Sequence, residues 1–326
     1  MDILYQLPFP KEVCSKIFIF ACKSPHTGLG GSILKKQLGT DDLNIHEKDE
    51  DVIIFDANSY EITNSLDDYP YKISIDIYYY TCFYNLMVIN LYDTCVTGDI
   101  INLNALPKLT EIYLGGTGVT GDIVNLKSLR NLTAIYLGGT GVTGDIANLK
   151  SLPKLTEIFF TSTGVTGDIA HLESLPNLTL IGLFNTGVTG DIAHLESLPK
   201  LTKINLSSTG VTGNIEHLES LRNLTEIDLG GTGVTGDIAH LQSLQNLTEI
   251  LLNETSVYGD IAQLKSLTKL SDIWFCETSV YGDSTELKSL PELAWIYIND
   301  TDIIINEELF HEYRESAGLE DCFIHI

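Results

Sequence analysis

The sequence predicts an α/β repeat solenoid, in which short parallel strands stack into a sheet and short helical turns line the opposite side. Two observations lead to this fold class. A Gly-Asp pair recurs with a period of 23 residues, without insertion or deletion, and apolar residues occupy the same places in every copy. A fixed period of this length indicates structural units that stack to bury a continuous core. The nine pairs, one of them Gly-Asn, begin at Gly98, Gly121, Gly144, Gly167, Gly190, Gly213, Gly236, Gly259 and Gly282.

One copy, residues 109–131, indicates the elements of each repeat. Counted from Leu109 as position 1, its apolar residues fall at positions 1, 4, 6, 11, 15, 18 and 21. Positions 4 and 6 alternate as in a strand, so a short strand is predicted over positions 3–5. From position 15 onward the spacing is three, which predicts a helical turn.

This pattern resembles the leucine-rich repeat, LxxLxLxxNxL, and is most similar to the plant-specific class, whose repeat continues LxGxIP. Residues 119–123, Val-Thr-Gly-Asp-Ile, fill that place. Thr117 and its equivalents replace the usual Asn, Ala usually replaces the Pro, and the repeat is one residue shorter. The resemblance covers residues 86 to about 303. It implies a concave parallel sheet with helical turns on the convex side, and it says little about the partner.

The ends of the chain lack the repeat and are expected to cap the stack, which solenoids require. We expect an N-terminal helical and β cap over 1–85, nine repeats over 86–292, and a last strand with an acidic helical cap over 293–326. Within the first cap, residues 10–22 and 33–38 predict helices, and residues 52–55 and 73–79 predict strands.

The acidic C-terminal segment predicts one helix. Asn306 is placed to cap its start, and Gly318 is placed to end it. Leu309, Phe310 and Tyr313 are expected to form its inner face. The segment holds eight acidic residues and a single basic one, Arg314, so its charge is expected to keep this end soluble.

Composition limits the function. The chain has 44 Asp and Glu against 19 Lys and Arg, a formal net charge of −25. Phosphate backbones and anionic membranes are bound through clustered basic residues, so neither is an expected partner. No enzyme motif is recognisable, and no cofactor is expected. A cytoplasmic or nuclear protein is predicted from three features: scattered cysteines, no secretion signal and no long apolar run. In such a protein the seven N-x-S/T sequons are expected to result from the repeat pattern and not to be glycosylation sites.

Three columns of equivalent residues are candidate functional sites. The Asp of each Gly-Asp pair precedes a helical turn, and Asn214 replaces it in one copy, which favours helix capping over calcium binding. His171, His194, His217 and His240 stack at position 17, where Asn, Gln or Glu stands in other copies, so a solvated edge is favoured over a metal or pH-sensing site. Thr at position 9 is expected to point inward and bond the backbone, which disfavours an ice-binding array.

The expected concave face is the best candidate for binding. Across positions 3, 5, 7 and 8 it carries ten acidic residues against Lys203 alone, and aromatic residues stand among them. Aromatic anchors within a charged rim are typical of protein interfaces. The candidate partner-binding residues are Tyr113, Tyr136, Phe159, Phe184, Glu226, Asp228, Glu249, Trp274, Glu277, Trp295 and Tyr297.

These observations predict a non-enzymatic interaction module that binds a protein with a basic patch on its acidic and aromatic face. Two alternatives stay open. Residues 7–20 resemble the opening of an F-box, LPxExxxxIF, which would make the chain an adaptor that links a bound target to a larger complex. The chain would otherwise serve as a structural subunit of a large assembly.

Overall fold

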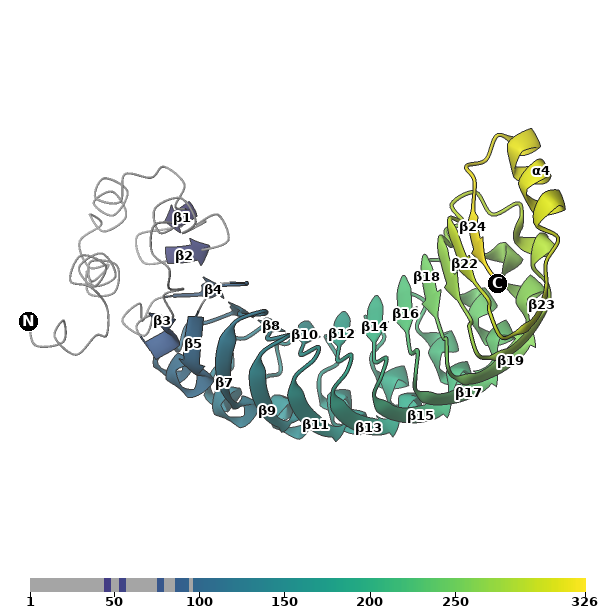
Figure 1. Cartoon of the computed structure of the whole chain (residues 1–326). Coiled ribbons are helices and arrows are strands. Elements are labelled where there is room, and N and C mark those ends of the chain that lie inside the picture. Colours follow the sequence, from purple (N-terminus) through teal and green to yellow (C-terminus); the bar gives the residue numbers. More distant parts are fainter. Residues whose placement is uncertain (1–43, 48–52, 57–74, 79–85, 94–95) are drawn as a thin grey trace, which may run out of the picture. The chain divides into compact units, whose positions relative to one another are not determined.

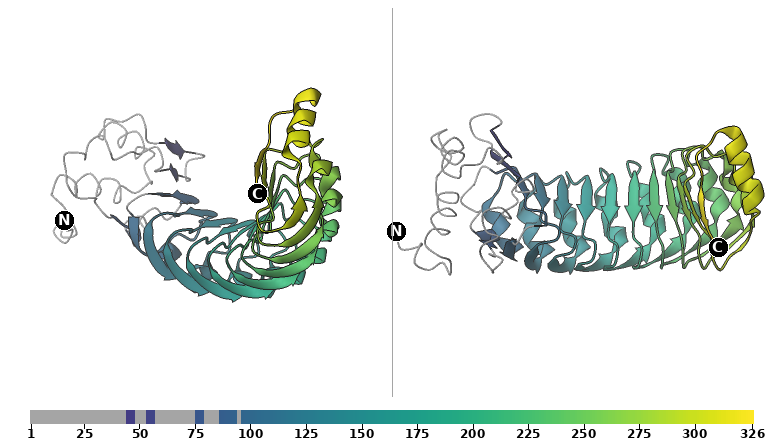
Figure 2. Two further views of the ribbon diagram at one scale, coloured as in Figure 1. Left: turned by 45° about the vertical axis from the view of Figure 1, so that its right-hand side comes forward. Right: turned by 45° about the horizontal axis from the view of Figure 1, so that its top comes forward.

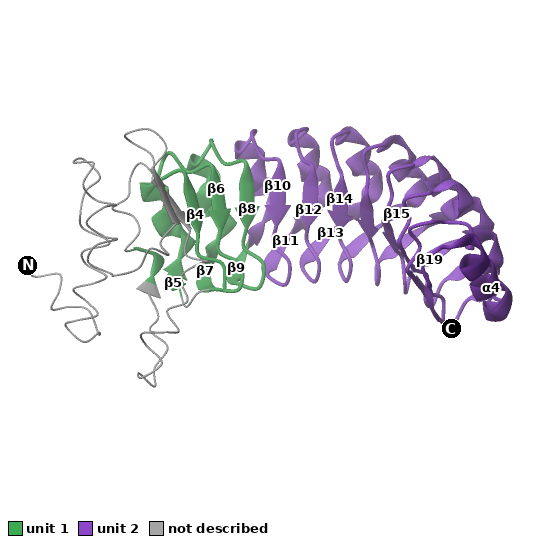
Figure 3. Cartoon of the chain, turned by 90° about the horizontal axis from the view of Figure 1, so that it is seen from above, with its two compact units in different colours: residues 1–143 green, residues 144–326 purple. Residues whose placement is uncertain are grey.

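The structure is a computed structural model that describes residues 44–47, 53–56, 75–78, 86–93 and 96–326 (Figure 1). The helices predicted over 10–22 and 33–38, and the segment that resembles an F-box, lie outside these residues. The chain divides into two compact units, Met1–Thr143 and Gly144–Ile326 (Figure 3).

The first sheet of unit 2, sheet A, consists of one short strand per repeat. Each strand pairs in parallel with the strand of the next repeat, so that Ile181 lies beside Ile204 and Ile204 beside Ile227. All of these strands except the last occupy positions 3–5 of a repeat, as the sequence predicted. The strands are β10 (Glu157–Phe159), β12 (Leu180–Gly182), β14 (Lys203–Asn205), β16 (Glu226–Asp228), β18 (Glu249–Leu251), β20 (Asp272–Trp274), β22 (Trp295–Tyr297) and β24 (Phe323–His325).

A second parallel sheet, sheet B, was not predicted. It is built from positions 10–14 of each repeat, where Val at position 11 is buried and Thr at position 12 is exposed. The Gly at position 13 has no apolar side chain, so the alternation of buried and exposed residues typical of a strand is not visible in the sequence. In Figure 1, sheet A of unit 2 lies on the inner side of the curve and sheet B on the outer side. Sheet B of this unit contains β11 (Gly164–Asp168), β13 (Gly187–Asp191), β15 (Gly210–Asn214), β17 (Gly233–Asp237), β19 (Ser256–Asp260), β21 (Ser279–Asp283) and β23 (Asp302–Ile304).

A short 3-10 helix follows most sheet B strands, as the apolar spacing of three predicted. The preceding Asp caps it: Asp168 Oδ1 accepts a hydrogen bond from the Ala170 N–H at 2.8 Å, and Asn214 does the same for Glu216 at 3.0 Å. The predicted capping role is therefore confirmed. These helices are η6 (Ile146–Ser151), η7 (Ile169–Ser174), η8 (Ile192–Ser197), η9 (Ile215–Ser220), η10 (Ile238–Ser243), η11 (Ile261–Ser266) and η12 (Ser284–Leu287).

The core lies between the two sheets and the helical turns. One repeat of unit 2 contributes Leu178, Ile181, Leu183, Val188 and Ile192, none of which is more than 1% exposed. Thr at position 9 points inward, as expected: Thr186 Oγ1 donates a hydrogen bond to the Leu183 carbonyl oxygen at 2.6 Å, and a threonine does the same in each neighbouring repeat. This bond satisfies a backbone carbonyl in the turn after each sheet A strand.

Unit 1 contains the same repeat and an additional hairpin. Strands β1 (Asn44–Glu47) and β2 (Ile53–Asp56) pair antiparallel, and β2 then pairs in parallel with β4 (Val88–Asn90), β4 with β6 (Glu111–Tyr113), and β6 with β8 (Ala134–Tyr136). Sheet B begins here with β3 (Ile75–Asp76), β5 (Val96–Asp99) and β7 (Gly118–Asp122), and β9 (Gly141–Asp145) continues it across the end of the unit. Helices η4 (Ile100–Ala105) and η5 (Ile123–Ser128) follow β5 and β7.

The predicted C-terminal helix is present as α4 (Glu307–Ala317), capped by Asn306 and ended by Gly318 in a left-handed conformation. Its predicted inner face is wrong in part. Phe310 is buried, whereas Leu309 and Tyr313 are 45% and 38% exposed.

Arg314 takes the inner position instead, and it is 1% exposed. Its guanidinium donates hydrogen bonds to the carbonyl oxygens of Leu290, Leu293 and Glu320 at 2.7–2.9 Å. The single basic residue of the acidic segment therefore joins α4 to the last repeat.

Among the described residues, no helix combines the length and apolar character needed to cross a bilayer. Figure 2 shows unit 2 from two further sides, with α4 at its C-terminal end.

Candidate binding surface

The outward face of sheet A in unit 2 carries most of the candidate residues. In each strand except β24 the middle residue is buried and its two neighbours point away from the core, because successive side chains of a strand alternate between faces. Parallel pairing in register then brings equivalent side chains of neighbouring repeats together, about 4.8 Å apart. Single residues of the repeat thus become continuous columns on one face.

At the C-terminal end of this face, aromatic rings form a cluster. The ring centroids of Trp274 and Tyr297 lie 4.6 Å apart, and those of Trp295 and Tyr297 lie 6.4 Å apart and are stacked. Both tryptophans keep large exposed fractions, 36% for Trp274 and 43% for Trp295. Three of the candidate residues therefore form one exposed aromatic group.

Two further members of this cluster were missed. Strand β24 brings Phe323 to 5.2 Å from Trp295, and His325 to 5.5 Å from Tyr297, measured between ring centroids. The signal was available in the sequence, because Phe323 and His325 alternate with the buried Cys322 and half-buried Ile324. We refer to Trp274, Trp295, Tyr297, Phe323 and His325 as the aromatic cluster.

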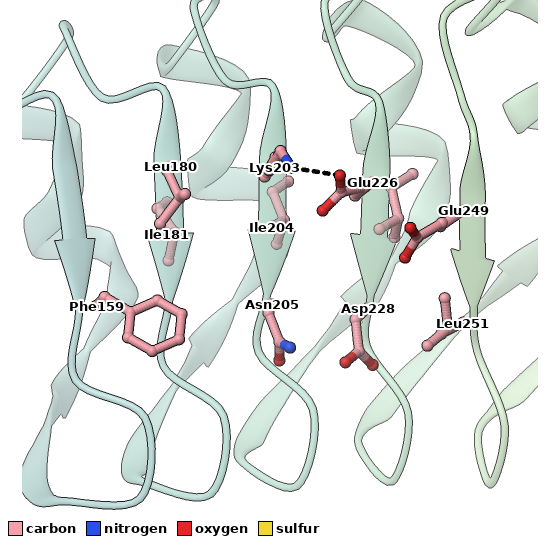
Figure 4. Close-up of a pocket in the computed structure, with 11 residues that line it drawn as sticks. Phe159, Leu180, Ile181, Lys203, Ile204, Asn205, Glu226, Asp228, Glu249 and Leu251 are labelled. Carbon is pink, nitrogen blue, oxygen red and sulfur yellow. Dashed lines mark hydrogen bonds and ion pairs between the residues drawn. The ribbon is translucent and has the colours of Figure 1, made fainter. Parts of the chain in front are cut away.

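Beside this cluster, a shallow depression of about 160 Å³ opens on the same face (Figure 4). Four candidate residues line it: Phe159, Glu226, Asp228 and Glu249. The Phe159 ring lies across Gly182, where a Cβ atom would collide with it. We refer to this hollow as the acidic depression; its remaining lining residues are Leu180, Ile181, Lys203, Ile204, Asn205, Ile227 and Leu251.

The carboxylates of the acidic depression differ in their partners. Glu226 forms an ion pair with Lys203. Asp228 accepts hydrogen bonds from Ser207 Oγ at 2.9 Å and from the Gly230 N–H at 3.3 Å. Glu249 makes no side-chain hydrogen bond or ion pair within the described part of the chain. One lysine thus faces three carboxylates, which leaves local negative charge.

Burial and charge crowding alter the acidity of two of these groups. Burial raises the pKa of Asp228, although hydrogen bonds from Ser207 and Gly230 act in the opposite direction. Burial also raises the pKa of Glu249, and the nearby Glu226 and Asp272 carboxylates raise it further. Both carboxylates are therefore held in an environment that disfavours their charge in the absence of a cation.

The remaining candidates lie elsewhere. In unit 1, Tyr113 and Tyr136 are neighbours, with ring centroids 5.0 Å apart. Phe184 and Glu277 stand in the turns that follow β12 and β20 and line neither the aromatic cluster nor the acidic depression. Glu277 has a φ of +56°, so position 8 is a turn residue in a left-handed conformation, not an exposed strand position as the sequence suggested.

The histidine column lies on the helical side of unit 2, and His194, His217 and His240 pair with glutamates, not with the Asp or Asn three residues earlier. His194 Nδ1 is 2.5 Å from Glu173 Oε1, and His217 Nδ1 is 2.6 Å from Glu196 Oε1, each glutamate belonging to the preceding repeat. The side chains of these two His–Glu pairs are 33–51% exposed. This is the partly solvated polar edge that the variety of residues at position 17 predicted.

The sequence matches no protein-family model, and the search of curated proteins gives no relative. Solved structures are similar. The plant peptide hormone receptor RGFR1 in complex with RGF2 matches with a TM-score of 0.63 and 25% identity over 71% of this chain and 38% of the receptor chain. The leucine-rich-repeat ectodomain of the membrane receptor kinase GASSHO1/SCHENGEN3 from Arabidopsis thaliana matches with a TM-score of 0.54 and 20% identity, over 72% and 35%. A plant ice-binding protein matches with a TM-score of 0.59 and 21% identity, over 72% and 80%.

These comparisons contradict one prediction. The chain was expected to be cytoplasmic or nuclear, but the similar structures include ectodomains of plant membrane receptors, so that expectation is wrong. The chain spans less than two thirds of the length of those receptor chains. The stacked parallel strands, the 23-residue register and the similar structures agree on the fold: the chain is a leucine-rich-repeat solenoid, similar to those of plant receptors.

Proposed function

We propose that the chain is a non-enzymatic interaction module that binds a protein with a basic patch on the sheet A face of unit 2. The observation that supports it most directly is the exposed aromatic cluster next to a face whose carboxylates outnumber its lysines. Apolar rings that stay exposed in the free protein gain the most by burial in a complex. The surrounding carboxylates favour a partner of opposite charge and exclude acidic ones.

The similar structures support the binding of a protein or peptide. The receptor RGFR1 was solved in complex with RGF2, and GASSHO1/SCHENGEN3 in complex with CASPARIAN STRIP INTEGRITY FACTOR 2. We infer by analogy that this chain also meets its partner outside the cytoplasm. The seven N-x-S/T sequons are then open to glycosylation, and digestion of the natural protein with a glycosidase tests this location.

The experiment that tests the proposed function starts with affinity capture on the full chain, followed by binding kinetics with the captured protein. Trp274→Ala is expected to weaken binding by about 2 kcal/mol, roughly thirtyfold, mainly through faster dissociation. Added salt is expected to slow association, because exposed charges are screened over about 8 Å at physiological ionic strength. The control is His194→Ala on the helical side, which should bind normally.

An affinity that depends on neither Trp274 nor salt would place the interface elsewhere on the chain and refute the proposal. The adaptor and structural-subunit alternatives need a separate comparison, because residues 1–43 lie outside the described structure. Deletion of residues 1–40 should abolish capture of a larger complex if the chain is an adaptor. It should leave a single stoichiometric partner bound if the chain is a binding module.

A second candidate function, ice binding, is favoured by the exposed face of sheet B in unit 2. There Thr166, Thr189, Thr212 and Thr235 form an outward column at position 12, distinct from the inward threonines of position 9. Each of the first three pairs with a glycine of the next strand, Gly187, Gly210 or Gly233, so no side chain stands directly beside it on that strand.

The pairing sets neighbouring threonines one strand spacing apart across the sheet and two residues apart along it, so they lie diagonally, about 8 Å from each other. A regular row of hydroxyl and methyl groups suits a regular solid surface better than the irregular surface of a protein. An ice-recrystallisation assay with the full chain tests this function. Thr189→Arg is expected to abolish inhibition if sheet B binds ice, whereas Trp274→Ala should not affect it. An absence of inhibition by the unmodified chain would rule out this second candidate.

A further inference from the structure

We propose that the acidic depression receives one basic side chain of the partner, with its ammonium or guanidinium group beside Glu249 and Asp228. The inference rests on the proposed function, because it assigns a specific place on the sheet A face to the partner's positive charge.

The charges of the depression favour a cation. Lys203 is already paired with Glu226, so it offsets the charge of the other carboxylates only in part. In Figure 4 the Glu249 carboxylate points from β18 toward β16, the strand that carries Asp228. Asp228 accepts its hydrogen bonds from Ser207 and Gly230, which lie in the turns that follow β14 and β16. A cation between β16 and β18 would therefore meet Glu249, which has no side-chain partner among the described residues, and the charge of Asp228.

The walls of the depression suit the aliphatic stem of a lysine or arginine. Leu180 and Leu251 line opposite sides, and the Phe159 ring lies over the gap left by Gly182. Basic side chains commonly bury their methylene groups against such apolar surface while the charged end remains near polar groups. The volume of about 160 Å³ suits a single side chain, not a folded element.

The register of sheet A fixes the distance from the depression to the aromatic cluster. Asp228 pairs with Leu251, and Leu251 pairs with Trp274. Two strand spacings amount to about 10 Å, which equals roughly three residues of an extended chain. A partner segment that crosses these strands would therefore carry a basic residue three positions from an apolar or aromatic residue.

A bound cation would also change the protonation of the depression. Glu249 faces Glu226, Asp228, Asp272 and Lys203, and the three carboxylates among these outweigh the one lysine. A cation pairs with the ionised carboxylates, so protonation of Glu249 and Asp228, whose pKa values are raised by burial, competes with binding. Affinity for a basic side chain is therefore expected to fall as the pH falls through these raised pKa values.

The test uses the full chain and two blocked tetrapeptides with leucine at the fourth position. One has lysine first, and the other has acetyl-lysine first, which removes the charge and keeps the stem. Binding is followed by NMR through the methyl groups of Leu180 and Leu251. The lysine peptide is expected to bind at least about fivefold more tightly than the acetyl-lysine peptide, since a charge-assisted contact exceeds a neutral one by about 1 kcal/mol.

Variants separate this inference from the proposed function. Glu249→Gln should remove the preference for lysine, whereas Glu173→Gln, with the same charge change on the helical side, should retain it. Trp274→Ala should weaken both peptides equally. Equal binding of the two peptides, or a preference that survives Glu249→Gln, overturns the cation site. If Trp274→Ala still weakens the captured partner in that case, the proposed function stands without this pocket.

Discussion

Gly190 lies directly against the carboxylate of Asp168, the residue that caps the helical turn of the preceding repeat. A Cβ atom at Gly190 would collide with Asp168 Oδ1 and would come within 3.1 Å of Ile169 Cγ1. Gly190 also has a φ of +116°, which side chains strongly disfavour. The two residues of the Gly-Asp pair therefore support each other across neighbouring repeats, which explains why they recur together.

Gly190→Ala is expected to destabilise the stack by about 2 kcal/mol or more, because the new methyl group adds a collision to an unfavourable φ. Denaturant unfolding followed by circular dichroism measures the loss. Gly231→Asn is the control: φ is +63° there, and the equivalent residues Asn185 and Ser208 adopt the same conformation. It should change the midpoint little, and equal losses in the two variants would contradict the proposed contact.

Asp168 supplies a second prediction about the same pair. Asp168→Asn keeps the oxygen that caps η7, as Asn214 does naturally for η9, and should cost only a few tenths of a kcal/mol. Asp168→Ala removes it and should cost about 1 kcal/mol. Unfolding midpoints of the two variants decide this. A larger loss for Asp168→Asn than for Asp168→Ala would show that the charge, and not the cap, matters.

The repeat register predicts unequal losses at two leucines. Leu183 is fully buried at position 6, and Leu183→Ala should cost about 2–5 kcal/mol. Leu251 lies on the outward face at position 5 and is only partly buried, so Leu251→Ala should cost clearly less. Because each repeat contacts only its neighbours, hydrogen exchange should localise the effect of Leu183→Ala around β12. A uniform effect along unit 2 would contradict this.

The sequence was sufficient for the sheet A strands and the helical turns, because both have a simple apolar period. It was insufficient for sheet B, because Gly at position 13 adopts a positive φ and interrupts the alternation that Val and Thr begin. It also misjudged position 8, where Glu277 and Asp300 adopt the left-handed conformation without being glycine. The aromatic columns were visible, but their grouping depended on β24, whose pairing with β22 brings Phe323 beside Trp295.

Arg314 shows a second limit of prediction from the sequence. The acidic charge of its segment predicted a soluble end of the chain, and nothing in the sequence indicated that this one basic residue would be buried. Its guanidinium bonds the carbonyl oxygens of Leu290, Leu293 and Glu320. Arg314→Lys retains the charge but loses the fork geometry, so several of these carbonyls would be left without a donor, each at about 1–3 kcal/mol. We expect earlier melting of the α4 end, measured by hydrogen exchange. Arg222→Lys, at an exposed site, is the control and should have little effect.

Glu249→Gln is expected to raise the stability of the free protein at neutral pH, which is unusual for a residue in a pocket. The folded-state pKa of Glu249 is raised by burial and by Glu226 and Asp272, so its ionised form is less stable in the folded chain than in the unfolded chain. That penalty is complete above the folded-state pKa. It disappears below the unfolded pKa of about 4.3, where both states are protonated.

The stability gain of Glu249→Gln should therefore be present at neutral pH and vanish at about pH 3. Melting temperatures of the variant and the parent chain across this range measure it, with Glu173→Gln as the matched control. Salt should reduce the gain at neutral pH, because part of the penalty is repulsion between partly exposed carboxylates. A variant that is less stable than the parent at neutral pH would mean that Glu249 is held by a favourable contact, and the acidic depression would then lack the unsatisfied charge on which cation binding depends.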